Sequence, residues 1–214
     1  MNALRVTRYA ALLLLVLLPA ALAAQTVERI AQPANGLSET IRHAVEERGY
    51  RVTLDNGWTA DFWFAKELNL PPQDKSNPNA LYPQLPASTF IGIVELHQNT
   101  PDYRGQAIRS GTYTLRYELL PQDGNHLGVA PNPDFLLVSP VTEDPNPMQP
   151  LALKKIVEMS SKTTGSHPAV IALENAAPPG TVVKTDNGSV FTIAIPAGSK
   201  TEKIGVCLTC SASQ

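Results

Sequence analysis

Two cysteines near the C-terminus, Cys207 and Cys210, form a Cys-x-x-Cys pair, a spacing that can carry chemistry. Such a pair can form a disulfide, take part in thiol redox reactions, or bind a soft metal ion such as copper(I). Redox-active pairs usually lie at a helix N-terminus, but only residues 211–214 follow here, too few for that helix. Covalent haem attachment needs a histidine directly after the second cysteine, where this chain has Ser211.

The N-terminal segment bears on this choice because it has the features of a cleavable export signal. Basic residues open it, the apolar run 10–18 follows, and Ala21-Leu22-Ala23 forms a small-x-small cleavage signal. The apolar stretch is shorter than the roughly 20 residues that a membrane-spanning helix needs. We therefore expect residues 1–23 to be a signal peptide, and the protein to be periplasmic or secreted. We expect no membrane anchor after cleavage, and no lipid modification because no cysteine lies near the cleavage site.

Export favours the disulfide, because paired thiols are usually oxidised outside the cytoplasm. Side chains three positions apart on a strand point to opposite faces, so a bridge between Cys207 and Cys210 requires a turn at Leu208-Thr209. That turn would end the last strand. A thiol-redox role, a soft-metal site through the same pair, and unpaired or intermolecular cysteines remain as alternatives.

The histidines give one further candidate for ligand binding. Four occur without paired metal-ligand spacing: His43, His97, His126 and His167. His126 lies in a loop-like segment with Asp123 and Asn125, and loops above a sheet are where convergent polar groups collect. These three residues could bind a cation or a polar ligand. We favour the simpler alternative, a turn at Asp123-Gly124-Asn125, and expect no metal and no cofactor.

The aromatic side chains are concentrated in one expected strand. Alternation places Trp58, Phe62 and Phe64 on one face and Trp63 on the other. Core packing is the favoured role, because aromatic side chains dominate protein cores. The alternative is an exposed Trp63 that contacts a carbohydrate or a protein.

Catalytic signatures give no positive indication of an enzyme. The chain contains no Gly-x-Ser-x-Gly, no His-Glu-x-x-His and no phosphate-binding glycine loop. A triad assembled from distant residues stays open, since triads are defined by geometry. We therefore lean towards a protein that binds rather than catalyses.

Composition narrows the range of partners. The chain has 17 basic and 19 acidic residues, and loss of Arg5 and Arg8 with the signal leaves 15 basic residues, a net charge of about −4. No basic cluster is present, which argues against nucleic acid and anionic lipid. The 19 prolines are hard to combine with long helices. Residues 24–214 are long enough to form one domain with an ordinary core.

Periodicity predicts a mainly β domain with one or two short helices. Helices are expected over 37–48 and 151–161, and Asp55-Asn56-Gly57 and Asp186-Asn187-Gly188 predict hairpin turns. Residues 112–119 should form a half-buried strand that begins with a corner tyrosine at Tyr113. The expected strands number about nine: 50–54, 58–65, 89–96, 112–119, 135–138, 169–173, 181–184, 189–195 and 203–208. Their spacing favours a β-sandwich of jelly-roll or immunoglobulin-like Greek-key type.

A resemblance supports the envelope location. The run Gly111-Thr-Tyr-Thr-Leu-Arg-Tyr, followed by Pro121-Gln-Asp-Gly-Asn-His-Leu-Gly-Val-Ala-Pro and Asp134-Phe-Leu-Leu-Val, resembles a family of uncharacterised exported bacterial proteins. The resemblance implies export from a bacterium and implies nothing about catalysis. Our leading hypothesis is a non-enzymatic envelope protein that recognises another protein, a glycan or a small ligand through loops 71–86 and 121–133.

Overall fold

Ten strands form one continuous antiparallel sheet in the computed structural model, which describes residues 25–31, 36–70, 77–121 and 128–212. The strand order is β1-β2-β3-β4-β7-β8-β9-β12-β11-β10. The strands of this sheet are β1 (Thr26–Ile30), β2 (Gly49–Thr53), β3 (Thr59–Phe64), β4 (Phe90–Leu96), β7 (Gly111–Leu119), β8 (Asp134–Pro140), β9 (Ala169–Glu174), β10 (Thr181–Thr185), β11 (Gly188–Ala197) and β12 (Lys200–Cys207). Two short strands, β5 (Thr100–Pro101) and β6 (Ala107–Ile108), pair only with each other.

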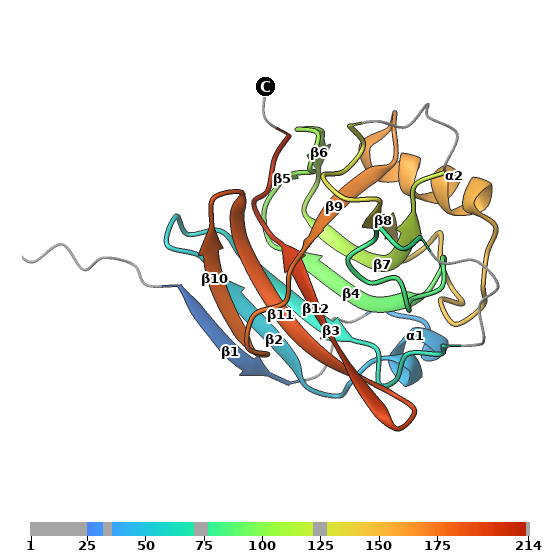
Figure 1. Cartoon of the computed structure of the whole chain (residues 1–214), viewed down its shortest axis with the longest axis horizontal. Helices are drawn as coiled ribbons and strands as arrows, with labels where there is room; N and C mark the ends of the chain where they lie inside the picture. Colours follow the sequence, from blue (N-terminus) through green and yellow to red (C-terminus); the bar gives the residue numbers. More distant parts are fainter. Residues whose placement is uncertain (1–24, 32–35, 71–76, 122–127, 213–214) are drawn as a thin grey trace, which may run out of the picture.

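The long sheet curls until its edges approach each other, which gives a nearly barrel-like form (Figure 1). The edge strands β1 and β10 are in contact along this seam. Lys184 of β10 forms an ion pair with Asp55 in the β2–β3 turn, and Gln25 Nε2 donates a hydrogen bond to Ser189 Oγ at 3.2 Å. Polar side chains therefore bridge the two edges.

Curling brings opposite walls of the sheet into contact through an aromatic core. The ring centroids of Phe62 and Phe64 on β3 lie 5.7 and 6.0 Å from that of Phe191 on β11. Such separations suit favourable aromatic pairing. The predicted mainly β fold is confirmed. A sandwich of two separate sheets is not confirmed, because all ten strands belong to one hydrogen-bonded series.

Local turn chemistry set several elements where the sequence predicted them. At the β2–β3 hairpin, Asn56 Oδ1 accepts a hydrogen bond from Trp58 N at 2.9 Å, and Gly57 takes a positive φ of 83°. At the start of β7, Tyr113 donates its hydroxyl proton to Arg109 O at 2.8 Å. The predicted hairpin and the predicted corner tyrosine are both confirmed.

The first helix, α1 (Glu39–Ala44), is shorter than predicted. Ser38 caps it as expected, accepting a hydrogen bond from Ile41 N at 3.2 Å. Val45 then turns to an extended conformation and forms an isolated β-bridge with Ala65. The prediction of a helix over 37–48 was therefore wrong at its C-terminal end, because this bridge to the chain after β3 takes precedence over local helical spacing.

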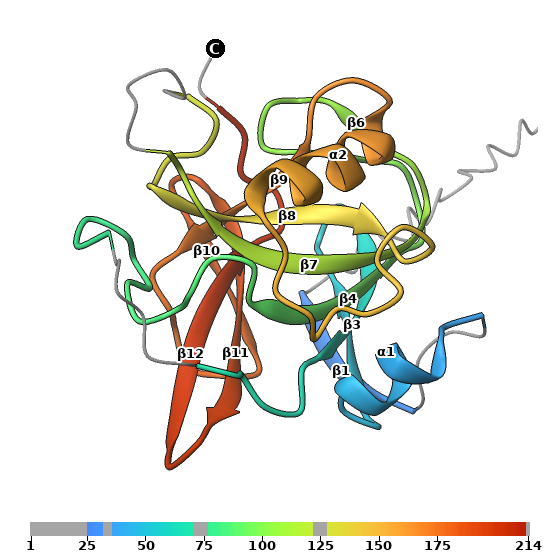
Figure 2. The same cartoon turned by 90° about the vertical axis from the view of Figure 1, so that its right-hand side faces the viewer.

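The second helix, α2 (Leu153–Thr164), covers the outer face of β8 and β9 (Figure 2). Ile156 is fully buried against this face. Ser160 Oγ and Thr163 Oγ1 both donate to Val138 O at 2.8 Å, which fixes the helix on the sheet. The helix ends at Gly165, whose φ of 79° provides the left-handed cap.

Strand β7 is buried on both faces, whereas a half-buried strand was predicted. Its outer face carries Thr114, Arg116 and Glu118, each no more than 1% exposed. The proline-rich connection between β8 and α2 lies over this face and is held there by hydrogen bonds from Arg116. The prediction was wrong because alternating polar residues on a strand usually indicate a face that is exposed to solvent. Here the segment that covers this face is distant in the sequence.

Candidate functional site

The predicted disulfide is present, and it closes the end of β12. Cys207 and Cys210 are bridged with a Cα–Cα distance of 5.6 Å, and the chain turns between them as expected. The two residues are only 4% and 8% exposed, and Tyr103 packs against their cluster. Thiol–disulfide exchange requires in-line approach of an attacking thiolate to a sulfur atom. The burial of both residues restricts such an approach, and the bridge joins the end of β12 to the segment that follows it.

Trp63, the aromatic candidate for ligand contact, lies beneath other residues. Its side chain is 2% exposed, and its indole N–H donates to Ala31 O at 3.1 Å. The backbone of Gly49 passes so close that a Cβ there would lie 2.6 Å from Trp63 Nε1. Trp63 is therefore a packed residue on the outer side of β3, with no exposed ring face for a carbohydrate or a protein.

The polar loop candidates Asp123, Asn125 and His126 lie outside the described residues. The flanking residues Pro121 and Val129 are described, and both line a cavity beside α2. Segment 121–133, which we predicted as a binding loop, thus borders a cavity through Pro121 and Val129, which lie before and after the undescribed residues 122–127.

One histidine takes part in a charged cluster that the sequence did not reveal. Arg51 donates from Nε and Nη2 to Asp61 at 2.8 and 2.7 Å, and His97 Nε2 lies 3.1 Å from Asp61 Oδ2. The hydrogen bonds to Asp61 raise the pKa of Arg51. The register of β2 with β3 places Arg51 directly opposite Asp61. The Arg51–Asp61 pair could have been predicted from the register of the hairpin. His97 could not, because it follows the end of β4, outside that hairpin.

A buried arginine fastens the proline-rich connection to the outer face of β7. Arg116 makes a bidentate contact with Asp144, with Nε–Oδ2 and Nη2–Oδ1 distances of 2.7 and 2.8 Å. Its Nη1 donates to Ser88 O at 2.9 Å, and Thr114 Oγ1 donates to Asp144 Oδ2 at 2.9 Å. Charge-assisted, bidentate geometry of this kind is among the stronger hydrogen-bonding arrangements. Arg116 also donates to Asn146 O and Gln149 O, so each of its N–H groups has an acceptor and the cluster acts as a structural clamp.

Glu118 lies further along the same face and is not saturated. Its Oε1 is buried without a hydrogen-bond partner among the described residues, and the residue is 1% exposed. Burial raises the pKa of Glu118 to about 7, although hydrogen bonds from backbone N–H groups and the charge of Arg116 act in the opposite direction. The carboxyl group therefore changes charge near neutral pH in a site closed to solvent.

The described part of loop 71–86 is anchored on the sheet by a second buried carboxylate. Asp134 accepts hydrogen bonds from Leu81 N at 3.0 Å and Tyr82 N at 2.9 Å. Tyr82 then donates to Glu174 O at 2.6 Å and accepts from Gly205 N at 2.7 Å. Burial raises the pKa of Tyr82 to about 12. These hydrogen bonds fix this part of the expected binding loop on the sheet at Leu81 and Tyr82.

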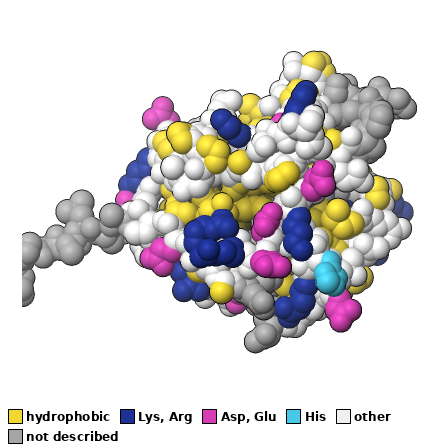
Figure 3. All heavy atoms as spheres, turned by 90° about the horizontal axis from the view of Figure 1, so that it is seen from below, with side chains coloured by type: hydrophobic (Ala, Val, Ile, Leu, Met, Phe, Trp, Pro, Cys, Tyr) yellow, Lys and Arg dark blue, Asp and Glu magenta, His cyan; other side chains and the backbone are white. Residues whose placement is uncertain are grey.

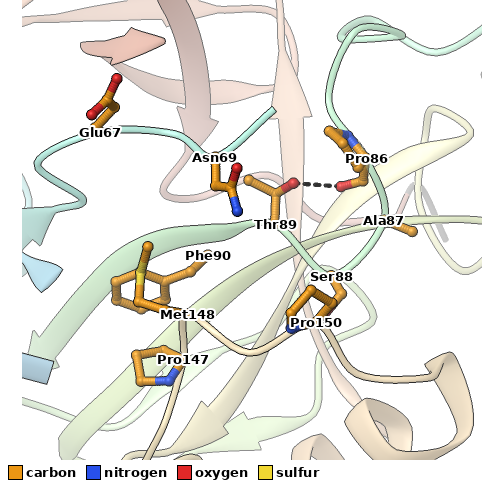
Figure 4. A pocket seen from close by; sticks show the side chains of 10 residues that line it. All are labelled: Glu67, Asn69, Pro86, Ala87, Ser88, Thr89, Phe90, Pro147, Met148 and Pro150. Carbon is orange, nitrogen blue, oxygen red and sulfur yellow. Dashed lines mark hydrogen bonds between the residues drawn. The ribbon is translucent and has the colours of Figure 1, made fainter. Parts of the chain in front are cut away.

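A small hollow lies where the proline-rich connection meets the start of β4 (Figure 4). Its volume is about 100 Å³, and Phe90, Pro147 and Met148 supply much of its wall. The hydroxyl groups at its edge are engaged: Thr89 Oγ1 donates to Pro86 O at 2.6 Å, and Ser88 Oγ accepts from Leu151 N at 2.9 Å. This hollow is a packing junction beside the Arg116 clamp.

A wider depression adjoins that hollow near the tip of the β11–β12 hairpin. Glu67, Asn69 and Met148 border both, and Glu67 Oε1 accepts from Gly198 N at 3.1 Å. Met148 is 41% exposed. The face of the molecule seen in Figure 3 has a hydrophobic hollow with acidic and basic side chains around it. Charges of both signs are interspersed there.

The cavity beside α2 is the candidate for ligand binding that we favour, because its wall is mainly apolar and a few polar groups lie within it. It has a volume of about 260 Å³ and lies between the helix, the outer face of β8 and β9, and the ends of segment 121–129. One end is wholly apolar, with Leu120, Pro121, Val129, Phe135 and Leu153. Leu137, Val157 and Val170 continue the wall towards the other end, where Arg104, His167 and Pro168 lie. The cavity is therefore an apolar slot with a cationic end.

The cationic end is built by the β5–β6 turn. Tyr103 N donates to Val170 O at 2.8 Å, which sets the turn against β9. Buried Asp102 accepts from Arg104 N at 3.0 Å and Gln106 N at 2.7 Å and so closes the turn. The turn carries Arg104 to the mouth of the cavity, where its Nη2 donates to Pro168 O. Sequence analysis missed Arg104 because it lies in an unremarkable polar connection.

The described ranges contain neither a metal-binding cluster nor a membrane-spanning helix. No cluster of three or more His, Cys, Asp or Glu side chains suited to a metal ion occurs among those residues. None of the helices described there has the length and apolarity needed to cross a membrane. Comparison of the chain with protein-family models, curated proteins and solved structures finds no match.

Proposed function

We propose that this chain is an exported, non-enzymatic binding protein of the bacterial envelope that holds a small, largely apolar ligand beside α2. The observation that carries the proposal is the apolar cavity of about 260 Å³ over β8 and β9. At about 30 Å³ for each water molecule, it holds the equivalent of eight or nine waters. Apolar cavities with a few polar groups are the usual form of small-molecule sites.

The lining of the cavity favours binding over catalysis. Among the described lining residues, Arg104 and His167 are the ionisable ones, and the others are Leu, Pro, Val and Phe. A nucleophile paired with a base is the usual signature of covalent catalysis. Glu118, whose pKa is raised by burial, is not among the described residues that line the cavity. We do not extend the proposal to thiol or metal chemistry at Cys207 and Cys210, because their bridge is buried.

The location of the protein is part of the proposal. It rests on the export features of residues 1–23 and on the resemblance of 111–138 to exported bacterial proteins. We expect the protein recovered from the periplasm of an expressing bacterium to begin at Ala24. Intact-mass measurement checks this, and recovery of the uncleaved chain in the cytoplasm would contradict it.

Calorimetric titration with octan-1-ol tests the binding function. An eight-carbon chain gains about 0.8 kcal/mol for each buried CH₂, or about 6 kcal/mol in all. The cost of association offsets part of this gain, so we expect a Kd in roughly the millimolar range. Leu153 lines the cavity, so Leu153→Trp should fill it and abolish binding. The matched control is Lys154→Trp on the exposed side of α2, which should bind like the wild type. Equal binding by both variants, or none by the wild type, would refute the proposal.

A further inference from the structure

The polar groups of the α2 cavity are gathered at one end. The pairing of β8 with β9 fixes which lining residues lie at which end of the cavity. Leu137 on β8 pairs with Val170 on β9, and Phe135 on β8 pairs with Ala172 on β9. Residues two apart on a strand are separated by about 7 Å. Leu137 and Val170 therefore mark the end that adjoins Pro168 and the β5–β6 turn, and Phe135 marks the apolar end. A ligand along this axis would meet a head region and a tail region.

The guanidinium group of Arg104 has unused hydrogen-bonding capacity at the head region. Its Nη2 donates to Pro168 O, but its Nε is buried without an acceptor among the described residues. Among the described residues, its nearest carboxylate contact is 3.9 Å, from Nε to Asp102 Oδ2, which is too long for a hydrogen bond. No hydrogen bond from Nη1 to another described residue is present. Because an arginine side chain has five N–H donors, the described residues leave most of this group unpaired.

Asp102 is unable to satisfy Arg104 because other donors occupy its carboxylate. Oδ1 accepts from Arg104 N and Gln106 N at 3.0 and 2.7 Å. Oδ2 accepts from Gln106 Nε2 at 2.9 Å and from Val170 N at 3.2 Å. Four donors thus hold the Asp102 carboxylate in the turn, and it makes no hydrogen bond to the Arg104 guanidinium group. Asp102 offsets part of the charge of Arg104 but leaves its N–H groups available.

We propose that the ligand of this cavity is an amphipathic carboxylate, such as a medium-chain fatty acid anion. Its carboxylate binds Arg104 beside His167, and its alkyl chain lies between α2 and β8 towards Phe135 and Leu153. The described lining residues include no carboxylate that would repel it. A planar carboxylate matches the fork of N–H donors on arginine. This inference rests on the proposed function and specifies its ligand class.

Paired titrations of the purified protein with sodium octanoate and octan-1-ol at pH 7.5 test the inference. The two probes share a chain length and differ in the head group. We expect octanoate to bind roughly tenfold more tightly, since hydrogen bonds to charged groups contribute about that much. Arg104→Met should weaken octanoate binding about tenfold and leave octan-1-ol binding unchanged, which also shows that the variant is folded. The matched control, Arg109→Met, alters an exposed arginine outside the cavity and should change neither.

The outcomes distinguish a wrong ligand class from a wrong proposed function. If octan-1-ol binds as tightly as octanoate or more tightly, the carboxylate head group is wrong and the apolar site stands. The same holds if Arg104→Met leaves octanoate affinity unchanged. If neither probe binds the wild type, both the inference and the proposed function fail. Stronger octanoate binding that is lost with Arg104→Met and kept with Arg109→Met supports the inference.

Discussion

Replacing Glu118 with glutamine should stabilise the protein at neutral and alkaline pH and remove a pH dependence. Burial raises the pKa of Glu118 from an ordinary 4.5 to about 7. The folded state then holds the proton more tightly than the unfolded state, so ionisation opposes folding. The penalty is absent below about pH 4.5, grows between pH 4.5 and 7, and is complete above pH 7. At about 1.4 kcal/mol for each pKa unit, it amounts to roughly 3 kcal/mol.

Urea unfolding of wild type and Glu118→Gln between pH 4.5 and 8.5, at one ionic strength, measures this penalty. The difference in the free energy of unfolding should be small at pH 4.5, where both side chains are neutral, and should rise by about 3 kcal/mol by pH 8. Glu158→Gln, an exposed position on α2, is the matched control and should show no such rise. A difference that stays constant from pH 4.5 to 8.5 would refute the account of a desolvated carboxyl group.

Three further substitutions test the framework around the cavity. Asp144→Ala leaves the Arg116 guanidinium buried without its counter-charge and should lower the free energy of unfolding by about 3–5 kcal/mol. The control Glu143→Ala loses only a partly exposed pair with Lys162 and should lower it by less than about 1 kcal/mol. Equal losses for the two variants in urea unfolding would contradict the role of Arg116 and Asp144 as a clamp. Replacing both Cys207 and Cys210 by serine removes a bridge that closes only a short loop, so the free energy of unfolding should fall by roughly 2 kcal/mol. Differential scanning calorimetry measures this loss. A variant that fails to fold would contradict so small a contribution. Tyr113→Phe removes the bond to Arg109 O and should cost about 1 kcal/mol in urea unfolding, whereas no measurable loss would contradict the role of this corner.

Elements governed by nearby residues were predictable from the sequence. Asn56 and Gly57 favour a hairpin in any context, and Ser38 caps α1 through a bond to a residue three positions away. Tyr113 reaches back only four residues, and the Cys207–Cys210 bridge spans three. Each of these interactions closes within one turn or one strand end, so local chemistry was enough to predict them.

Features that depend on distant partners were not predictable in the same way. β1 was missed because five residues become a strand only when the edge of β2 is available for pairing. Arg116 and Asp144 are 28 residues apart, and nothing local marks them as a buried pair. Without that pair in view, the outer face of β7 looked solvent-exposed. The curling of the sheet likewise depends on the pairing of β9 with β12, which joins the two halves into one series.

The candidate site was predicted only at its borders. Segment 121–133 was expected to bind a ligand, and two of its residues, Pro121 and Val129, line the α2 cavity. The residues that give the cavity its polarity, Arg104 and His167, come from two other connections. In the sequence, His167 is one of four histidines without paired metal-ligand spacing, and nothing nearby marks it as a site residue. Their convergence depends on the docking of the β5–β6 turn against β9, a contact between residues 67 positions apart.

The most direct test of the central claim is where an amphipathic carboxylate binds. In ¹⁵N–¹H correlation spectra of the labelled protein titrated with sodium octanoate, we expect saturable shifts at the amides of Leu137, Val157 and Val170. The amides of Thr89 and Phe90, beside the separate hollow of Figure 4, should stay unchanged. Absence of saturable shifts at the α2 cavity, or shifts centred on the hollow at Thr89 and Phe90, would contradict the account.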